Sequence, residues 1–188
     1  MRKARAQGYR SRAAFKLMEM NTRERLLIPG RRVADLGAAP GGWSQVAAEK
    51  AGPRGRVAAV DLLEIAPIPG VTVLRGDFRA AEVRAKVIEA LGGEVDVVLS
   101  DLSPNLSGIA SADQARAAEL VRAALAFALE HLHGEGSFLV KVFQGAEFEE
   151  ILREMRRSFA KVRVLKPAAS REESRETYLL GRGLKVTR

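Results

Sequence analysis

The chain has 188 residues, 47% of them hydrophobic and 29% charged, with a net charge of +8 and no cysteine. This length suits a single domain over residues 1–188, and the lack of cysteine excludes disulfides, thiolate metal sites and thiol nucleophiles. Two histidines are too few to favour a zinc site or a histidine-based triad, and no apolar run approaches the about 20 residues that span a bilayer.

The positive charge lies at the two ends of the chain. Residues 1–32 carry ten Lys and Arg against two Glu, and residues 161–188 carry eight basic residues against three acidic ones. This asymmetry suggests a polyanionic partner such as nucleic acid, although a solvated Arg-rich surface is the alternative interpretation. We therefore expect residues 1–31 to form a basic RNA-binding segment whose helix leads into the domain. The segment lacks the apolar stretch of a secretory signal, although its composition is compatible with a transit peptide. A soluble cytoplasmic protein without a membrane partner is the simplest expectation.

Short β-branched runs alternate with helical patterns, which predicts an α/β sheet. Strands are expected near 32–37, 56–61, 71–76, 95–101, 137–143, 161–165 and 177–181, and helices at 11–21, 43–51, 80–91, 112–133 and 147–158. The 112–133 helix has the clearest periodicity, with Ser111 as its cap and Gly134 at its end. His131 and His133 are expected in its last turn, where they would interact favourably with the helix dipole.

Two connections bear on the order of the strands. The residues between the sixth and seventh strands are few and lack helical periodicity, so the last strand should run antiparallel to its predecessor. The 62–70 connection is also short, and by the same rule it should not cross over to a parallel third strand.

A glycine-rich turn follows the first strand, from Gly37 to Trp43. Its glycines let the backbone approach a ligand, but their spacing matches neither the dinucleotide motif nor a P-loop. Asp61, at the end of the second strand, could accept hydrogen bonds from two ribose hydroxyls, and Asp77, after the third, from an adenine amine. The alternative is that both are strand-end caps. Nucleoside recognition without phosphate-binding groups points to S-adenosylmethionine.

The fourth strand ends at Asp101, at the sheet edge where α/β enzymes carry out their chemistry. Enzymes that methylate amine nitrogens have Asn-Pro-Pro-Tyr-like residues at this point, and carbon methylation of pyrimidines usually needs a cysteine, so an oxygen acceptor remains. Lys141 lies within a Val- and Phe-rich strand, where burial is costly without a partner. A lysine that extends to solvent at the strand edge is the alternative. Lys16 and Glu176 add a second lysine and a second carboxylate.

Six segments of the chain resemble the FtsJ/RrmJ (RlmE-type) family of ribosomal RNA 2′-O-ribose methyltransferases. They are residues 9–12, 35–45, 76–79, 100–108, 141–145 and 174–178. The resemblance implies a class I S-adenosylmethionine-dependent methyltransferase fold, which is Rossmann-like, with a seven-stranded, mostly parallel sheet and an antiparallel last strand. This fold requires the 62–70 connection to cross over, against the length rule.

The resemblance also assigns the site residues. The Lys-Asp-Lys-Glu tetrad of the family corresponds to Lys16, Asp101, Lys141 and Glu176. The expected cofactor-binding residues are Gly37, Ala39, Pro40, Gly41, Gly42, Trp43, Asp61, Asp77, Phe78 and Asp101. Trp43 is also interpreted as a packing residue. RNA docking is assigned to Arg2, Lys3, Arg5, Arg10, Arg12, Arg171 and Arg175, and no metal site is expected.

The Asn-Leu-Ser-Gly sequence at 105–108 is closer to the bacterial rRNA enzymes than to the relatives that methylate tRNA. We therefore expect 2′-O-methylation of large-subunit (23S-type) rRNA, at a uridine in the A loop of the peptidyl-transferase centre. The enzyme would act as a monomer on rRNA in the large subunit or its precursor, with Lys141 acting on the 2′-oxygen as a base or as a cation. The alternatives are a tRNA 2′-O-methyltransferase, a non-catalytic ribosome-assembly factor and a small-molecule O-methyltransferase.

Overall fold

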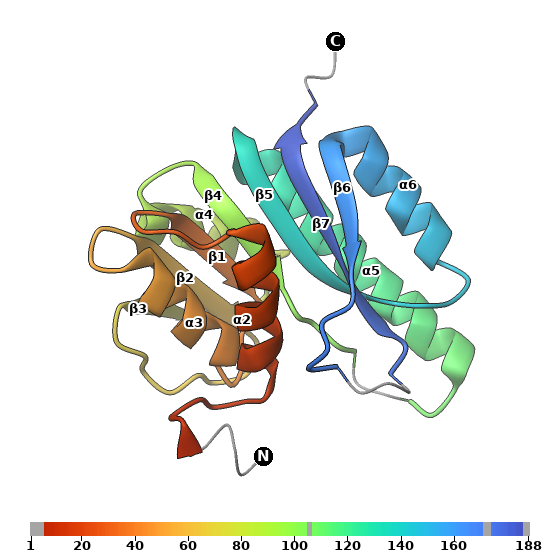
Figure 1. Cartoon of the computed structure of the whole chain (residues 1–188), viewed down its shortest axis with the longest axis horizontal. Coiled ribbons are helices and arrows are strands. Elements are labelled where there is room, and N and C mark those ends of the chain that lie inside the picture. The colour runs from red at the N-terminus through yellow and green to blue at the C-terminus, as the bar shows by residue number, and fades with distance from the viewer. Residues whose placement is uncertain (1–5, 105–106, 171–173, 186–188) are drawn as a thin grey trace.

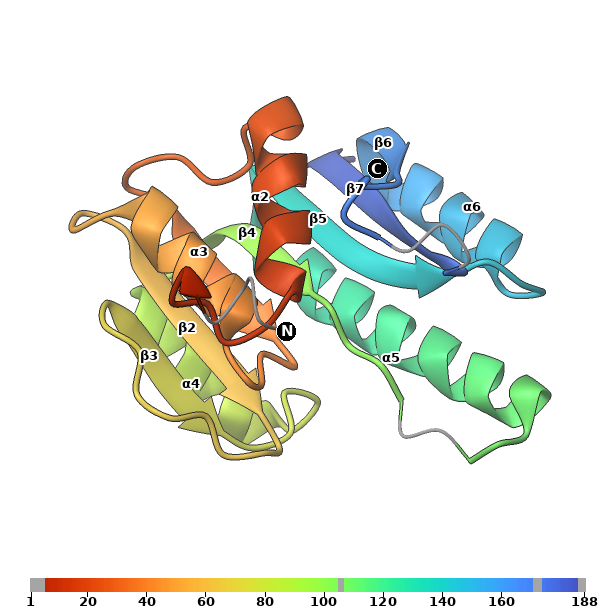
Figure 2. The same ribbon diagram turned by 60° about the horizontal axis from the view of Figure 1, so that its bottom comes forward.

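The computed structural model describes residues 6–104, 107–170 and 174–185, which form a seven-stranded sheet with helices on both faces (Figures 1 and 2). The strands are β1 (Arg32–Leu36), β2 (Arg56–Asp61), β3 (Val71–Arg75), β4 (Val95–Ser100), β5 (Leu132–Phe143), β6 (Phe159–Leu165) and β7 (Glu176–Leu184). The helices are α2 (Ala13–Glu24), α3 (Gly42–Ala51), α4 (Ala81–Leu91), α5 (Ala110–His131) and α6 (Phe148–Ser158). None of the helices in the described ranges is both long and apolar enough to cross a membrane.

The strand order is β3-β2-β1-β4-β5-β7-β6. Strands β1 to β5 pair in parallel, whereas β7 lies between β5 and β6 and is antiparallel to both. The predicted α/β class and the antiparallel last strand are therefore confirmed. A parallel sheet gathers the carboxyl ends of its strands at one edge, where the chain can place polar side chains side by side.

The 62–70 connection does cross over, so the expectation from its length was wrong. Strand β3 pairs in parallel with β2 although no helix separates them. Nine extended residues span up to about 30 Å, more than the about 20 Å that a six-residue strand covers. Ile65 and Ile68 pack against Ala38 and Ala59, so the extended segment buries its own apolar side chains as a crossover helix would.

The boundary between α5 and β5 also differs from the prediction. Helix α5 ends at His131 and β5 begins at Leu132, so His133 and Gly134 belong to the strand. His133 lies with its Nε2 2.9 Å from a carboxylate oxygen of Asp96 on the neighbouring β4, and burial lowers the pKa of His131. His131 thus lies in the last turn as expected, although its lowered pKa disfavours the charged form, whereas His133 lies in β5 and outside the helix.

The start of α5 was also assigned to the wrong cap. Ile109 occupies the cap position without a side-chain hydrogen bond, and Ser111 is already inside the helix. The carboxylate of Asp113, in the first turn, instead accepts hydrogen bonds from the backbone N–H groups of Ser107 and Gly108. These bonds fold the preceding loop back onto the start of the helix.

Two apolar cores lie on opposite faces of the sheet. Leu17 of α2 and Val46 of α3 pack on the face that includes Leu139 of β5. Helices α4, α5 and α6 cover the other face, where Leu125 and Leu152 belong to the larger core. The sheet is therefore buried on both sides, as a parallel sheet requires.

Helix α2 is fixed at both of its ends. At its start the indole nitrogen of Trp43 donates a hydrogen bond to the carbonyl of Ala13, at 2.8 Å. At its end Glu24, 8% exposed, pairs with Arg163 of β6 at 2.9 Å. These two anchors determine where the helix presents Lys16.

We expect Glu24→Gln to lower the free energy of unfolding by about 1–3 kcal/mol, because Arg163 and Arg182 would lose the carboxylate that they share. Urea denaturation followed by circular dichroism measures the change. Glu130→Gln is the matched control, since its half-exposed carboxylate lies 3.8 Å from Arg84 and should matter little. Equal stability of both variants would contradict this role of Glu24.

Candidate functional site

Lys141 is buried at the centre of the candidate site, with 6% of its side chain exposed. Its Nζ donates hydrogen bonds to the carbonyl of Asp101 at 3.0 Å and to the hydroxyl of Ser103 at 2.6 Å. A carboxylate oxygen of Asp101 lies 3.4 Å away and one of Glu176 lies 3.9 Å away. The amine is thus paired within the protein, and the alternative of a lysine that extends to solvent is wrong.

Glu176 joins the two lysines of the predicted tetrad. Its Oε2 accepts a hydrogen bond from Lys16 at 2.7 Å, while its other oxygen faces Lys141. Burial alone would raise the pKa of Glu176, but the hydrogen bond from Lys16 and the charge of Lys141 outweigh it and lower that pKa. The structure therefore brings all four tetrad residues together, from α2, the end of β4, β5 and β7.

Tyr178 is a member of this cluster that the sequence analysis missed. It is fully buried, and its hydroxyl donates a hydrogen bond to Asp101 at 3.0 Å. Burial and the charges of Asp101 and Glu176 raise the pKa of Tyr178, so it remains a donor at neutral pH. Its position two residues after Glu176 in one strand was the available signal, because such residues share a face of the sheet.

Two opposing effects act on the pKa of Asp101. Burial raises its pKa, and the nearby charges of Lys141 and Lys16 only partly offset this, so the pKa of Asp101 stays above its usual value. Asp101 lies directly after β4, in the middle of the sheet. Asp101 therefore contacts Lys141, and it stands at the end of the strand next to β1, which the glycine-rich turn follows.

The glycine-rich turn brings the backbone close to two side chains. Gly37 has φ +72°, and a Cβ there would lie 1.8 Å from Leu102; Gly41 has φ +107°, and a Cβ there would lie 2.5 Å from Ile68. Larger residues would therefore both strain the backbone and displace these neighbours. The turn leads directly into α3, which begins at Gly42.

Asp61 and Asp77 each have a local partner. The two carboxylate oxygens of Asp61 accept hydrogen bonds from the N–H groups of Ala39 and Leu63, at 2.9 and 2.8 Å. The hydrogen bonds from Arg79 lower the pKa of Asp77. These contacts agree with the strand-end interpretation. Each Asp61 oxygen has a further lone pair that can accept from a ligand, whereas each Asp77 oxygen already accepts two hydrogen bonds from Arg79, which a ligand amine would have to replace. The cofactor roles stay predictions.

Two aromatic residues of the predicted cofactor set face the interior. Phe78 is 6% exposed and Trp43 is 3% exposed. The Trp43 ring lies 5.8 Å from that of Tyr178, which agrees with the packing role expected for it. Its contact with the cofactor stays a prediction.

Asp35 is a second ionisable residue that the sequence analysis did not single out. It is 1% exposed, and Ser44 donates a hydrogen bond to it at 2.6 Å. Burial, assisted by the charges of Asp101 and Asp61, raises the pKa of Asp35 to about 7 in spite of that hydrogen bond. A carboxylate inside an otherwise apolar strand was the signal for it.

Arg10 has a structural role that the sequence did not reveal. Its guanidinium donates hydrogen bonds to the carbonyls of Pro40, Ala66 and Pro67. It therefore links the glycine-rich turn to the 62–70 crossover, and these contacts use donors that the RNA-docking assignment required.

The other predicted RNA-docking residues fall into two groups. Arg12 at the start of α2 and Arg175 beside Glu176 are exposed. Arg12 precedes Lys16 by one helical turn, so both basic groups lie on one face of α2. The remaining assignments, Arg2, Lys3, Arg5 and Arg171, lie outside the described residues.

The residues at this edge fit the proposed cofactor. Asp61, Asp101 and Asp77 stand at or after the ends of β2, β4 and β3. Asp61 and Asp101 offer acceptors and negative charge, while Asp77 is paired with Arg79. Such an edge repels a phosphate, whereas a cationic nucleoside with hydroxyl and amine donors is complementary to it.

Comparison with known proteins agrees with this geometry. The model of the FtsJ-like methyltransferase family matches residues 9–184. Ribosomal RNA large subunit methyltransferase E of Nitrosospira multiformis is 55% identical over 97% of this chain and 89% of that protein. The corresponding protein of Nitrosomonas europaea is 53% identical over 96% and 88%. A crystal structure described as a ribosomal RNA methyltransferase from Plasmodium falciparum superposes with a TM-score of 0.82 at 27% identity, covering 94% of this chain and 98% of the other.

We expect Asp35→Asn to flatten the pH dependence of stability. The folded protein keeps the Asp35 proton up to a pKa of about 7, whereas the unfolded chain releases it near the ordinary value, so this group's stabilisation is lost as the pH rises through 7. Above pH 7 the variant should therefore be more stable than the wild type. The difference in the free energy of unfolding should be a few kcal/mol, at about 1.4 kcal/mol per pKa unit. Urea midpoints between pH 5 and 8.5 measure this difference.

Asp113→Asn gives a control of opposite sign. The hydrogen bonds from Ser107 lower the pKa of Asp113, so its carboxylate stabilises the folded state at neutral pH. Replacing it should lower stability near pH 7. A loss of stability in Asp35→Asn at pH 8 would contradict the role assigned to Asp35.

Proposed function

Because this chain belongs to the FtsJ-like methyltransferase family, we propose that it methylates a ribose 2′-hydroxyl of large-subunit ribosomal RNA. Family membership makes it an S-adenosylmethionine-dependent RNA methyltransferase, and its relatives support ribosomal RNA as the substrate. The observation that carries the proposal is the buried Lys141 amine, held among acceptors at the sheet edge that also bears the glycine-rich turn.

The finer proposal follows the resemblance in the sequence. The acceptor would be a uridine in the A loop of the peptidyl-transferase centre. The chain would act as a single methyltransferase domain, as a cytoplasmic monomer, on rRNA within the large subunit or its precursor. The Asn-Leu-Ser-Gly sequence at 105–108 supports rRNA over tRNA.

The cofactor would bind along the edge formed by β1, β2, β3 and β4. S-adenosylmethionine supplies a methyl group on a positively charged sulfur, so positioning and proton handling remain for the protein. The backbone of residues 37–43 would contact the cofactor. Asp61 would accept from its ribose hydroxyls, Asp77 from its adenine amine, and Asp101 would lie near its methionine end.

Lys141 would act on the attacking 2′-oxygen. Two acceptors already fix its Nζ, the carbonyl of Asp101 and the hydroxyl of Ser103, so little rotational freedom is left to lose when the ribose binds. Glu176 restrains the amine from the opposite side, and Lys16 in turn holds Glu176. The new oxygen–carbon bond would replace the methyl–sulfur bond of the cofactor, and the hydroxyl proton would pass to Lys141 when the amine acts as a base, or to solvent when the amine acts as a cation.

We expect Lys141→Ala to lower turnover about 10²–10⁴-fold, the usual contribution of a general acid or base. S-adenosylhomocysteine affinity, measured by calorimetry, should be preserved because the turn and the Asp61 edge are unchanged. Lys161→Ala removes an exposed lysine from β6 and serves as the matched control. A Lys141→Ala protein that binds the cofactor and keeps more than a tenth of wild-type turnover would refute the assignment.

The substrate is tested by mass mapping of ribose methylation in rRNA from cells that lack this protein. We expect one 2′-O-methyl group to disappear from large-subunit rRNA and to return when purified protein is added to ribosomal particles. Methylation of deproteinised tRNA instead would favour the tRNA alternative. Unchanged methylation in both RNAs would favour a non-catalytic assembly factor.

Arg12→Ala and Arg175→Ala should each weaken RNA binding and reduce its salt dependence. Each lost phosphate contact lowers the slope of log affinity against log salt by about 0.7–0.9. Arg157→Ala is the control, because this exposed residue lies in the last turn of α6, at the opposite edge of the sheet. Filter binding of rRNA fragments at several salt concentrations measures the slopes, and unchanged slopes would argue against the docking assignment.

A further inference from the structure

A cleft of about 430 Å³ adjoins the lysine cluster. It lies between the loop after β4, the first turns of α5 and the end of β5, and Ser103, Gln114, Phe143 and Glu176 are among the residues that line it. This volume lies within the range of small-ligand sites. The S-adenosylmethionine residues lie on the other side of Asp101, along β1, β2 and β3, so the proposed cofactor contacts leave this cleft unexplained.

The cleft lies beside the Lys141 amine. Ser103 and Glu176 line it, and both face Lys141, at 2.6 and 3.9 Å. The ring centroid of Phe143 lies 5.6 Å from the Lys141 Nζ. A group bound in the cleft is therefore next to whatever Lys141 acts upon.

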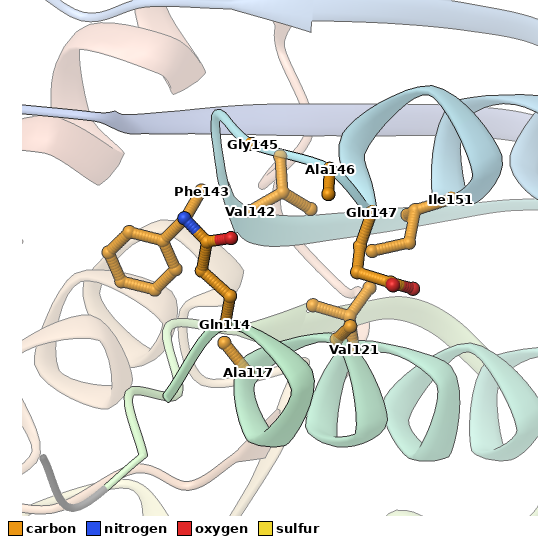
Figure 3. Close-up of a pocket in the computed structure, with 10 residues that line it drawn as sticks. Gln114, Ala117, Val121, Val142, Phe143, Gly145, Ala146, Glu147 and Ile151 are labelled. Atoms are coloured by element: carbon orange, nitrogen blue, oxygen red, sulfur yellow. The ribbon is translucent and has the colours of Figure 1, made fainter. Parts of the chain in front are cut away.

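Gln114 and Phe143 form the inner wall of the cleft. Figure 3 shows the Gln114 side chain reaching from α5 to the Phe143 ring at the end of β5. Beyond these two residues only a gap of about 20 Å³ remains, room for about one water molecule. The cleft thus ends at an aromatic ring and an amide, and the Gln114 amide makes no hydrogen bond to another described residue.

We propose that this cleft holds the base of the methylated nucleotide, stacked on Phe143 with its hydrogen-bonding edge at Gln114. The inference rests on the proposed function, because it begins from a ribose 2′-oxygen at Lys141. In one nucleotide the base and the 2′-oxygen are attached to neighbouring sugar carbons, so a 2′-oxygen at Lys141 brings the base beside the Phe143 ring. RNA-binding proteins commonly stack splayed-out bases on aromatic rings and read their edges.

The wall also matches the chemistry of the proposed uridine. An amide has one acceptor oxygen and two N–H donors, and the uracil edge presents an N–H between two carbonyl oxygens. Gln114 can therefore accept from the base N–H and donate to a base carbonyl. A base held in this cleft would have left the RNA stack, as happens in enzymes that extrude their target nucleotide.

The first test is Phe143→Leu, which keeps apolar volume but removes the aromatic face. Stacking is worth about five- to 100-fold in affinity, so we expect a fall of that size in kcat/KM with ribosomal particles and unchanged S-adenosylhomocysteine affinity. Phe143→Tyr should lose less than Phe143→Leu. Phe148→Leu is the matched control, because this ring packs in the α5–α6 core outside the cleft.

The second test separates base stacking from a general structural effect. Wild-type and Phe143→Leu proteins are compared on an RNA fragment that carries the mapped target nucleotide and on the same fragment abasic at that position. We expect the loss caused by Phe143→Leu to disappear on the abasic fragment, because the base is already missing. An equal loss on both fragments would overturn the proposal. If the wild-type protein leaves ribosomal particles without 2′-O-methylation, the proposed function is refuted instead.

Discussion

The pairing of one buried amine is the constraint on which the structure depends. An unpaired charge at the position of Lys141 would be strongly destabilising, so acceptors must meet it there. These acceptors come from Asp101 and Ser103 after β4 and from Glu176 at the start of β7. Lys16 of α2 in turn donates a hydrogen bond to Glu176. Elements distant in the chain therefore converge on one point, and the same convergence gives the arrangement from which we propose methyl transfer to an oxygen.

The edge of the sheet is divided into two halves of different chemistry. Along β1 to β4 it bears carboxylates and a glycine-rich backbone, which suit a cationic nucleoside. Towards β5 and β7 it bears two lysines and Glu176, which suit an attacking hydroxyl. Asp101 belongs to both halves, and the hydrogen bond from Tyr178 fixes one of its oxygens. The antiparallel direction of β7 is essential here, because β7 starts at the edge of the sheet where its neighbour β5 ends.

Local patterns in the sequence predicted much of this. The alternation of strand and helix signals, the turn at 37–43 and a lysine in an apolar strand are properties of neighbouring residues, and each was found where expected. The resemblance to a family then grouped the four tetrad residues. The predictions that failed concerned the 62–70 connection, judged by its length, and the two ends of α5, judged by their capping residues. Ile65 and Ile68 let a short segment cross over without a helix, and β-pairing of Leu132 ended α5 earlier than its periodicity indicated.

The sequence by itself determined the fold class, the approximate strand positions and the residues available for chemistry, because these depend on side-chain type and short-range periodicity. Only the tertiary structure decided which partner each polar group takes. Lys16 and Glu176 meet across 160 positions, and the guanidinium of Arg10 contacts carbonyls 30 to 57 positions away. Such contacts depend on how the helices and strands are placed relative to one another, and no local pattern records that placement.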